Sequence, residues 1–134
     1  MSPKIVAIDH LVLTVASIKE TVAFYRNALG METKEFPAAG SSSRWALYFG
    51  RQKINLHQAG EEFAPHARRA TAGSADLCFL SDTDLTKWQA HLSDCGVEVE
   101  EGPVPRSGAV RPIISIYIRD PDGNLIEISN PSDL

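Results

Sequence analysis

The sequence has 134 residues, 43% of them hydrophobic and 22% charged, and a formal net charge of −4. This composition is typical of one compact globular domain. With 13 basic residues, 17 acidic residues and no basic block, we expect no binding to nucleic acid or to an anionic membrane. No apolar run approaches the ~18 residues that a membrane span requires. We therefore expect a cytoplasmic protein whose two thiols, Cys78 and Cys95, are reduced core residues.

The first half of the chain predicts a strand, a helix and three more strands. Residues 5–15 alternate and are rich in β-branched side chains, which favours a strand. Ser17 precedes Glu20 by three residues, the spacing of a capping box, and Gly30 ends the helical pattern. The three further strands are expected at residues 31–36, 44–49 and 53–57.

The second half predicts the same order of elements. A strand is expected at residues 76–80, followed by helix caps at Ser81, Asp82 or Thr83 and a helix that ends at Gly96. Further strands are expected at 97–101, 113–119 and 124–129, with a turn at 120–123. Two segments fall outside the repeat: a polar connector, residues 58–74, and a Pro- and Gly-rich loop, residues 102–112, which we interpret as a candidate lid.

Polar residues occupy matching places in the two halves. His10 and Asp76 lie in the first strand of each half and are separated by 66 residues, the same offset as Gly30 and Gly96. His57 and Glu127 lie in the last strand of each half. Two imidazoles and two carboxylates would neutralise a divalent cation and leave positions for water or substrate oxygens. The pattern predicts a metal site built from both halves.

Each of these residues also has an ordinary structural interpretation. A single His near a strand start is commonly a hydrogen-bonded structural residue. Asp76 alone suits a turn after residues 73–74, and Glu127 alone suits an edge-strand charge. The coincidence of all four favours the metal site. Substrate contacts are assigned with a weaker signal to Arg44, Arg106, Arg111 and Tyr117.

Three stretches of the chain resemble one known family. They are residues 10–13 (HLVL), 24–31 (FYRNALGM) and 120–127 (DPDGNLIE). These stretches are similar to the vicinal oxygen chelate superfamily, also called the glyoxalase/bleomycin-resistance/dioxygenase group, and in particular to its small glyoxalase-domain-containing members, some of them labelled virulence-associated. The resemblance covers residues from about 5 to 130.

The resemblance implies an α+β fold of two tandem βαβββ modules, whose curved mixed sheets enclose a cavity with one divalent metal ion. Residues 1–134 would then form one domain, with module one at about 5–57, connector 58–74 and module two at about 75–130. It further implies a homodimer with sites at the interface. His10 and His57 of one chain would there meet Asp76 and Glu127 of the other.

The implied activity is that of a metal-dependent lyase or isomerase of the glyoxalase I type, acting on a small substrate with adjacent oxygens. Glu127 or Asp76 would move a proton between adjacent carbons. The substrate would be a small molecule, such as a glutathione adduct, and the metal Ni, Zn, Mn, Co or Fe. Two alternatives stay open: a ring-cleaving or other Fe(II) dioxygenase, and a metal-free drug-binding protein of the bleomycin-resistance type.

Overall fold

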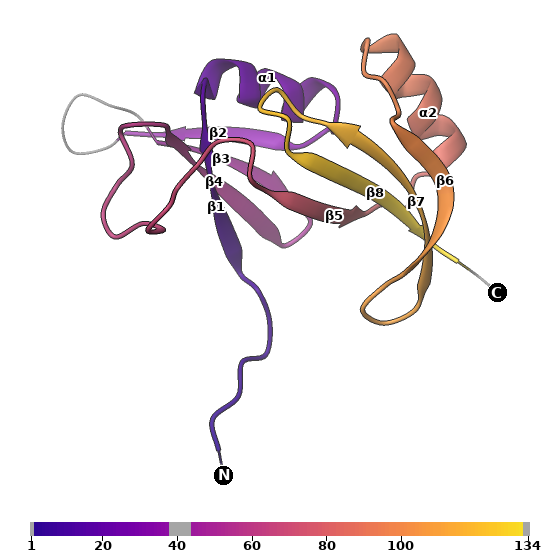
Figure 1. Ribbon diagram of the computed structural model, residues 1–134, viewed down its shortest axis with the longest axis horizontal. Helices are drawn as coiled ribbons and strands as arrows, with labels where there is room; N and C mark the ends of the chain where they lie inside the picture. Colours follow the sequence, from indigo (N-terminus) through magenta and orange to yellow (C-terminus); the bar gives the residue numbers. More distant parts are fainter. Residues whose placement is uncertain (1, 38–43, 133–134) are drawn as a thin grey trace. The chain divides into compact units, whose positions relative to one another are not determined.

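The computed structural model describes residues 2–37 and 44–132. The chain divides into two compact units, residues 1–71 and 72–134, each with one helix and one four-stranded sheet in its described part (Figure 1). The first unit contains β1 (His10–Val15), α1 (Ile18–Asn27), β2 (Glu32–Phe36), β3 (Arg44–Phe49) and β4 (Gln52–Gln58). The second contains β5 (Asp76–Leu80), α2 (Leu85–Asp94), β6 (Glu101–Ser107), β7 (Pro112–Arg119) and β8 (Leu125–Pro131).

Both sheets have the same topology. The strand orders are β1-β4-β3-β2 and β5-β8-β7-β6. In each sheet the first strand of the unit runs parallel to the last, and the other neighbours are antiparallel. The predicted α+β fold of two βαβββ modules with mixed sheets is therefore confirmed. No helix in the described part of the chain is long and apolar enough to cross a membrane.

One face of each sheet is apolar and buried. In the first unit α1 packs against β2, β3 and β4, and its Tyr25 is fully buried. In the second unit α2 contacts β8, and its Leu92 is fully buried. The buried residues of the strands are mostly Leu, Ile and Val at alternating positions, as period-two patterning requires: Leu13, Val15, Leu47, Ile54, Leu56, Ile116, Ile118, Ile126 and Ile128. Because this face is occupied, the opposite face of each sheet presents the polar residues.

A side-chain amide at the end of the last strand anchors each helix. Asn130 accepts a hydrogen bond from the Leu85 backbone N–H (2.9 Å) and donates to the carbonyls of Ser81 and Thr83. In the first unit Gln58 accepts from the Ile18 N–H (3.2 Å) and donates to the Ala16 carbonyl (2.7 Å). Each amide satisfies a free N–H at the helix N-terminus. Gln58 and Asn130 thus hold equivalent positions in the two modules.

The strand predicted from residue 5 begins only at residue 10. Ile5, Val6 and Ile8 are β-branched like typical strand residues, yet 93%, 96% and 68% of their surfaces are exposed. The partner strand explains the difference, because β4 starts at Gln52 and pairs Lys53 with His10. Residues 2–9 therefore run away from the end of β1 (Figure 1).

The loop predicted at 102–112 is mostly a strand, and the candidate lid is wrong. Residues 101–107 form β6, which pairs antiparallel with β7 through a register shift between Glu101 and Val104. Proline is tolerated there because β6 is the outer strand of its sheet, where missing N–H donors face outward. Gly102 lies at the shift with φ +108°, and a Cβ at this position would collide with the backbone of Ser115. Only residues 108–111 connect β6 to β7.

The predicted helix caps are partly confirmed. The Ser17 hydroxyl accepts a hydrogen bond from the Glu20 N–H (3.2 Å), as the capping box requires. The cap of α2 is Asp84, which accepts from the Thr86 N–H (2.9 Å), and not one of the three residues before it. Ser81 instead accepts from the Trp88 indole N–H (2.8 Å) and fixes that ring against the start of the helix.

The predicted turn between β7 and β8 is held by a buried carboxylate. Asp120 is 6% exposed and accepts hydrogen bonds from the N–H groups of Asp122 and Asn124, both 3.0 Å, and from the Asn124 side chain (2.8 Å). Asn124 in turn accepts from the Ala75 N–H (2.8 Å), directly before β5. The turn therefore ties the start of β5 to the start of β8.

We predict that Asp120→Ala lowers the free energy of unfolding by about 2–3 kcal/mol, because two backbone donors and one amide lose a buried charged acceptor. Urea denaturation followed by circular dichroism measures the change. Asp82→Ala, an exposed acidic residue before α2, is the matched control and should change stability by less than about 0.5 kcal/mol. Equal effects of the two substitutions would contradict the role of Asp120.

Candidate metal and ligand site

The open face of the second sheet carries two carboxylates on adjacent strands. In the parallel register Asp76 lies beside Leu125, and Cys78 lies beside Glu127. Because alternate residues of a strand share a face, Asp76, Cys78 and Glu127 all point to the side away from α2. Asp76 and Glu127 are offset by two residues, about 7 Å along the strands. The structure thus brings these two predicted site residues together.

Two buried hydroxyls hold one oxygen of Glu127. Ser115 on β7 donates to Glu127 Oε2 (2.5 Å), and the Ser129 hydroxyl lies 3.5 Å from the same oxygen. The two hydroxyls are also 2.7 Å from each other, and both residues are fully buried. Hydroxyls of this kind fix the orientation of a carboxylate. The sequence analysis missed both serines, although each lies at an alternating polar position of an otherwise apolar strand.

Cys78 belongs to the same cluster. Its sulfur lies 3.3 Å from the Ser129 hydroxyl. Burial of the sulfur raises the pKa of the Cys78 thiol, the Ser129 hydrogen bond lowers it, and the neighbouring Glu127 and Asp76 carboxylates raise it again. The thiol is therefore protonated at neutral pH. The expectation that both thiols are core residues is wrong, because Cys78 and Cys95 are each exposed as whole residues.

His10 lies on the open face of the first sheet, at the start of β1. Its Nδ1 is 2.8 Å from Asp9 Oδ2, and the His10 side chain is 43% exposed. Metal-binding imidazoles commonly donate one ring N–H to a carboxylate, which fixes the ring and makes the other nitrogen a better ligand. The Asp9 contact places the His10 ring in this arrangement and occupies Nδ1 rather than Nε2.

The register shows which residue of β4 corresponds to Glu127. In the first sheet His10 lies beside Lys53, and Val12 lies beside Asn55. Asn55 therefore has the same position relative to His10 in the first sheet as Glu127 has relative to Asp76 in the second sheet. The equivalent amides Gln58 and Asn130 support this alignment, since each lies three residues after Asn55 or Glu127. His57, which we matched with Glu127 from the sequence, corresponds instead to Ser129.

His57 shares a face with His10 but lies farther along the sheet. It pairs with Thr14, four residues after His10, which is about 13 Å along the strand. The structure does not bring these two imidazoles together within the module. In neither unit, over the described residues 2–37 and 44–132, do three or more His, Cys, Asp or Glu side chains gather closely enough to hold a metal ion.

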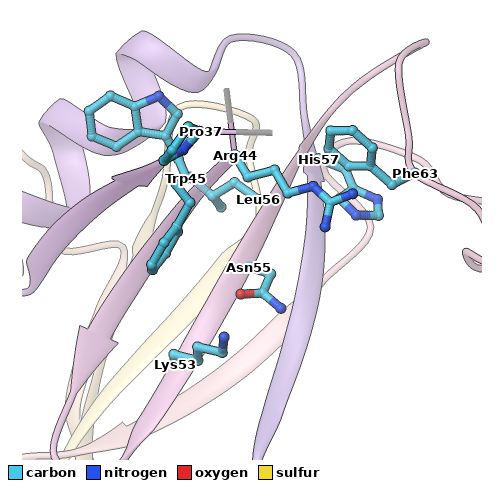
Figure 2. Close-up of a pocket in the computed structure, with 9 residues that line it drawn as sticks. Pro37, Arg44, Trp45, Lys53, Asn55, Leu56, His57 and Phe63 are labelled. Atoms are coloured by element: carbon cyan, nitrogen blue, oxygen red, sulfur yellow. The ribbon is translucent and has the colours of Figure 1, made fainter. Parts of the chain in front are cut away.

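His57 instead lines a cavity of about 420 Å³ on the first unit (Figure 2). The cavity opens over β3 and β4 and is closed on one side by Phe63 of the connector. Its walls combine basic, amide and aromatic side chains: Phe36, Pro37, Arg44, Trp45, Lys53, Asn55, Leu56, His57 and Phe63. This volume is in the range of small-molecule sites. The sequence analysis missed Phe63, whose signal is an aromatic residue within a polar connector.

Aromatic contacts order the basic groups of this cavity. The Arg44 guanidinium carbon lies 4.0 Å from the centre of the Phe63 ring, and the His57 ring packs edge-on against Phe63 at 5.4 Å. Burial lowers the pKa of His57 below its usual 6.5, the Glu62 carboxylate raises it, and His66 and Arg44 lower it. His57 Nδ1 is buried and has no hydrogen-bond partner among the described residues.

The remaining substrate candidates lie elsewhere. Arg106 Nε donates to the Tyr117 hydroxyl (2.7 Å), and Arg106 Nη2 pairs with Glu101 (3.0 Å), so these side chains are bound to one another on the open face of the second sheet. Hydrogen bonds to Tyr117 and Glu101 raise the pKa of Arg106. Arg111 is exposed in the β6–β7 connection. Arg44 is the one predicted substrate residue that lines the cavity.

The donor types on the two open faces fit a divalent cation. The second unit offers two carboxylates, one of them pre-oriented by hydroxyls, and the first offers an imidazole with a carboxylate behind it. Carboxylate, imidazole and amide oxygen are suitable ligands for Mn, Fe, Co, Ni and catalytic Zn. Within the described residues, each module by itself supplies fewer donors than such an ion requires.

We predict that His57 titrates below pH 6.5, because burial disfavours its charged form. NMR of the imidazole protons measures the midpoint. Glu62→Gln should lower the midpoint further and Arg44→Gln should raise it, while Glu61→Gln, a neighbouring exposed carboxylate, serves as control. Since the folded protein then binds this proton less well than the unfolded chain, His57 lowers stability as the pH falls below 6.5. A midpoint above 6.5 would contradict the burial of this ring.

Comparison with known proteins places the chain in one family. Curated relatives include Virulence protein STM3117 of Salmonella typhimurium (strain LT2), 53% identical over 91% of this chain and 82% of that protein. Another is Glyoxalase domain-containing protein RDO1 of Mycosarcoma maydis, 50% identical over 95% of this chain and 69% of that protein. Among solved structures, an integron cassette protein of V. cholerae superposes with a TM-score of 0.92 at 54% identity, covering 98% of this chain and 100% of that one.

More distant relatives include named enzymes. Lactoylglutathione lyase from Agrobacterium tumefaciens has a TM-score of 0.69 at 26% identity, over 92% of each chain. Metallothiol transferase FosB of Staphylococcus haemolyticus is 27% identical over 93% of this chain and 84% of that protein. The family model for the Glyoxalase/Bleomycin resistance protein/Dioxygenase superfamily matches residues 7–128. The chain belongs to this superfamily.

Proposed function

We propose that the protein is a divalent-metal-dependent enzyme of the glyoxalase I type, a lyase or isomerase whose small substrate carries two adjacent oxygens. The observation that carries this proposal is the pair of carboxylates, Asp76 and Glu127, on one open face of an otherwise apolar sheet. A charged group in so apolar a strand is costly unless an interaction compensates it. The named relatives lactoylglutathione lyase and metallothiol transferase support an enzymatic function.

In this proposal the metal ligands are His10, Asp76 and Glu127, and Asn55 takes the fourth position. Asn55 replaces His57 in the set because the strand register equates Asn55 with Glu127. The metal identity is one of Ni, Zn, Mn, Co or Fe. The two kinds of module come together in a homodimer, and the protein acts in the cytoplasm on a small molecule such as a glutathione adduct.

The bound ion would polarise the two substrate oxygens and stabilise the negative charge that develops on them. Glu127 is the residue that accepts a proton from one substrate carbon and returns it to the next. The hydroxyls of Ser115 and Ser129 fix its Oε2 and leave Oε1 to meet the substrate. The protonated Cys78 thiol beside this carboxylate adds no negative charge to the site.

We predict that the purified protein binds one divalent ion per site and that His10→Ala and Glu127→Ala abolish this binding, because each removes a ligand. Asn55→Ala should weaken binding, whereas His57→Ala should leave it intact. Elemental analysis after dialysis against Ni, Zn, Mn and Co measures occupancy, with the exposed His66→Ala as control. Full metal occupancy in both the His10 and Glu127 variants would contradict the proposed set of metal ligands.

We further predict turnover of the methylglyoxal–glutathione hemithioacetal with at least one of Ni, Zn, Mn or Co. Glu127→Gln should reduce kcat by about 10²–10⁴-fold, because the amide cannot accept the proton. Ser115→Ala should reduce kcat less, because it frees the carboxylate but does not remove it. A protein that binds metal and shows no turnover would contradict the lyase assignment, and oxygen consumption with Fe(II) would favour a dioxygenase.

A further inference from the structure

The cavity of the first unit is basic, although the chain as a whole has a formal net charge of −4. Arg44, Lys53 and His57 line it, and no acidic residue is among its lining residues. Glu62 is the carboxylate that acts on His57, and it is committed to the connector through a hydrogen bond from the Gly60 N–H (3.0 Å). The local excess of positive charge favours an anionic ligand.

The two permanent cations of the cavity have no carboxylate partner among the described residues, since no salt bridge joins either of them to an acidic group. Their contacts are aromatic: Arg44 stacks on Phe63, and Lys53 Nζ lies 6.0 Å from the centre of the Tyr48 ring. A guanidinium that stacks on a ring keeps its planar N–H donors available for a bidentate bond to a carboxylate or phosphonate. Figure 2 shows the Arg44 side chain extended across the cavity toward His57 and Phe63.

The uncharged residues that line the cavity determine which uncharged part of a ligand it can accommodate. Phe36, which pairs with Arg44 on the neighbouring strand, and Phe63 present ring surface. Flat apolar surfaces of this kind favour a planar unsaturated group. The Asn55 amide supplies a hydrogen-bonding position beside it.

We infer that this cavity binds a small organic anion, in which a carboxylate or phosphonate contacts Arg44, a planar unsaturated body packs against Phe36 and Phe63, and Lys53 adds positive charge farther along β4. The inference rests on the proposed function in one respect, which is that the anion is the substrate of the metal site. Asn55 connects the two, because it lines the cavity and is the fourth metal ligand of the proposed function. Anion binding itself requires no metal ion.

The test uses the full chain stripped of metal with EDTA, and four probes followed by calorimetry and ¹⁵N NMR. Benzoate and phenylphosphonate carry both features, benzamide has the same shape without the charge, and acetate has the charge without the ring. We expect saturable binding of benzoate, phenylphosphonate or both, with shifts at the Arg44 Nε–H and the Asn55 side-chain amide, and affinities at least about tenfold lower for benzamide and acetate.

Four variants locate the binding. Arg44→Gln should weaken binding of the anion about tenfold or more, Arg44→Lys should restore part of it, and Lys53→Gln should weaken it less. Arg51→Gln, an exposed cation in the β3–β4 turn that does not line the cavity, is the matched control and should change affinity less than twofold. All three substituted side chains lie at the surface or the cavity mouth, and thermal denaturation verifies that each variant is folded.

Three results would overturn the inference: no saturable binding of either aromatic anion, equal affinity for benzamide, or equal affinity in Arg44→Gln and Arg51→Gln. Because the experiment is run without metal, the proposed function is tested separately. Loss of metal binding with retained anion binding would refute the metal site alone. Metal-dependent turnover without anion binding in the stripped protein would refute the present inference alone.

Discussion

The parallel pairing of the first strand with the last strand of each module is the constraint on which the rest of the structure depends. A parallel register fixes, for every rung, which two side chains share a face. Leu13 and Ile54 lie toward the helix of the first module, and Leu77 and Ile126 lie toward the helix of the second. The polar residues between them therefore point to the opposite face of the sheet. Slipping either strand by one residue would bury Glu127 against α2 and expose Ile126 and Ile128. The amides of Gln58 and Asn130 hold this register by tying the end of the last strand to the start of each helix.

The two open faces that result are chemically different, although they descend from one repeated pattern. The second unit presents carboxylates whose charge is oriented by buried hydroxyls, a favourable arrangement for binding a cation. The first unit presents Arg44 and Lys53 beside aromatic rings, a favourable arrangement for binding an anion. A metal-dependent reaction on an anionic substrate needs both environments, because the ion and the substrate charge must be held by groups of opposite sign. The different chemistry of the two modules is consistent with the proposed function, in which one module binds the cation and the other binds the anionic substrate.

Several expectations from the sequence failed for one common reason, which is that strand formation depends on a partner. Residues 5–9 have the composition of a strand and no neighbour to pair with, so β1 begins at His10. Residues 102–107 have the composition of a loop, yet they pair with β7, because an outer strand accommodates Pro103 and Pro105 on its unpaired side. The match between His57 and Glu127 also failed, because the paired residues of the first and last strands are 43 residues apart in the first module (His10 and Lys53) and 49 apart in the second (Asp76 and Leu125).

The sequence by itself determined the βαβββ repeat, the two helices with their stop glycines, the turn at Asp120 and the membership of a superfamily, because hydrophobic periodicity and local turn chemistry are encoded within a few adjacent residues. It also identified His10, Asp76 and Glu127 as polar residues at strand positions where packing alone does not explain them. Only the tertiary structure decided that Asn55 holds the position in the first module that Glu127 holds in the second, that Ser115 and Ser129 hold Glu127, and that Phe63 closes a basic cavity around Arg44 and His57. These relations join residues far apart in the chain, and the register and packing that create them are properties of the assembled sheet.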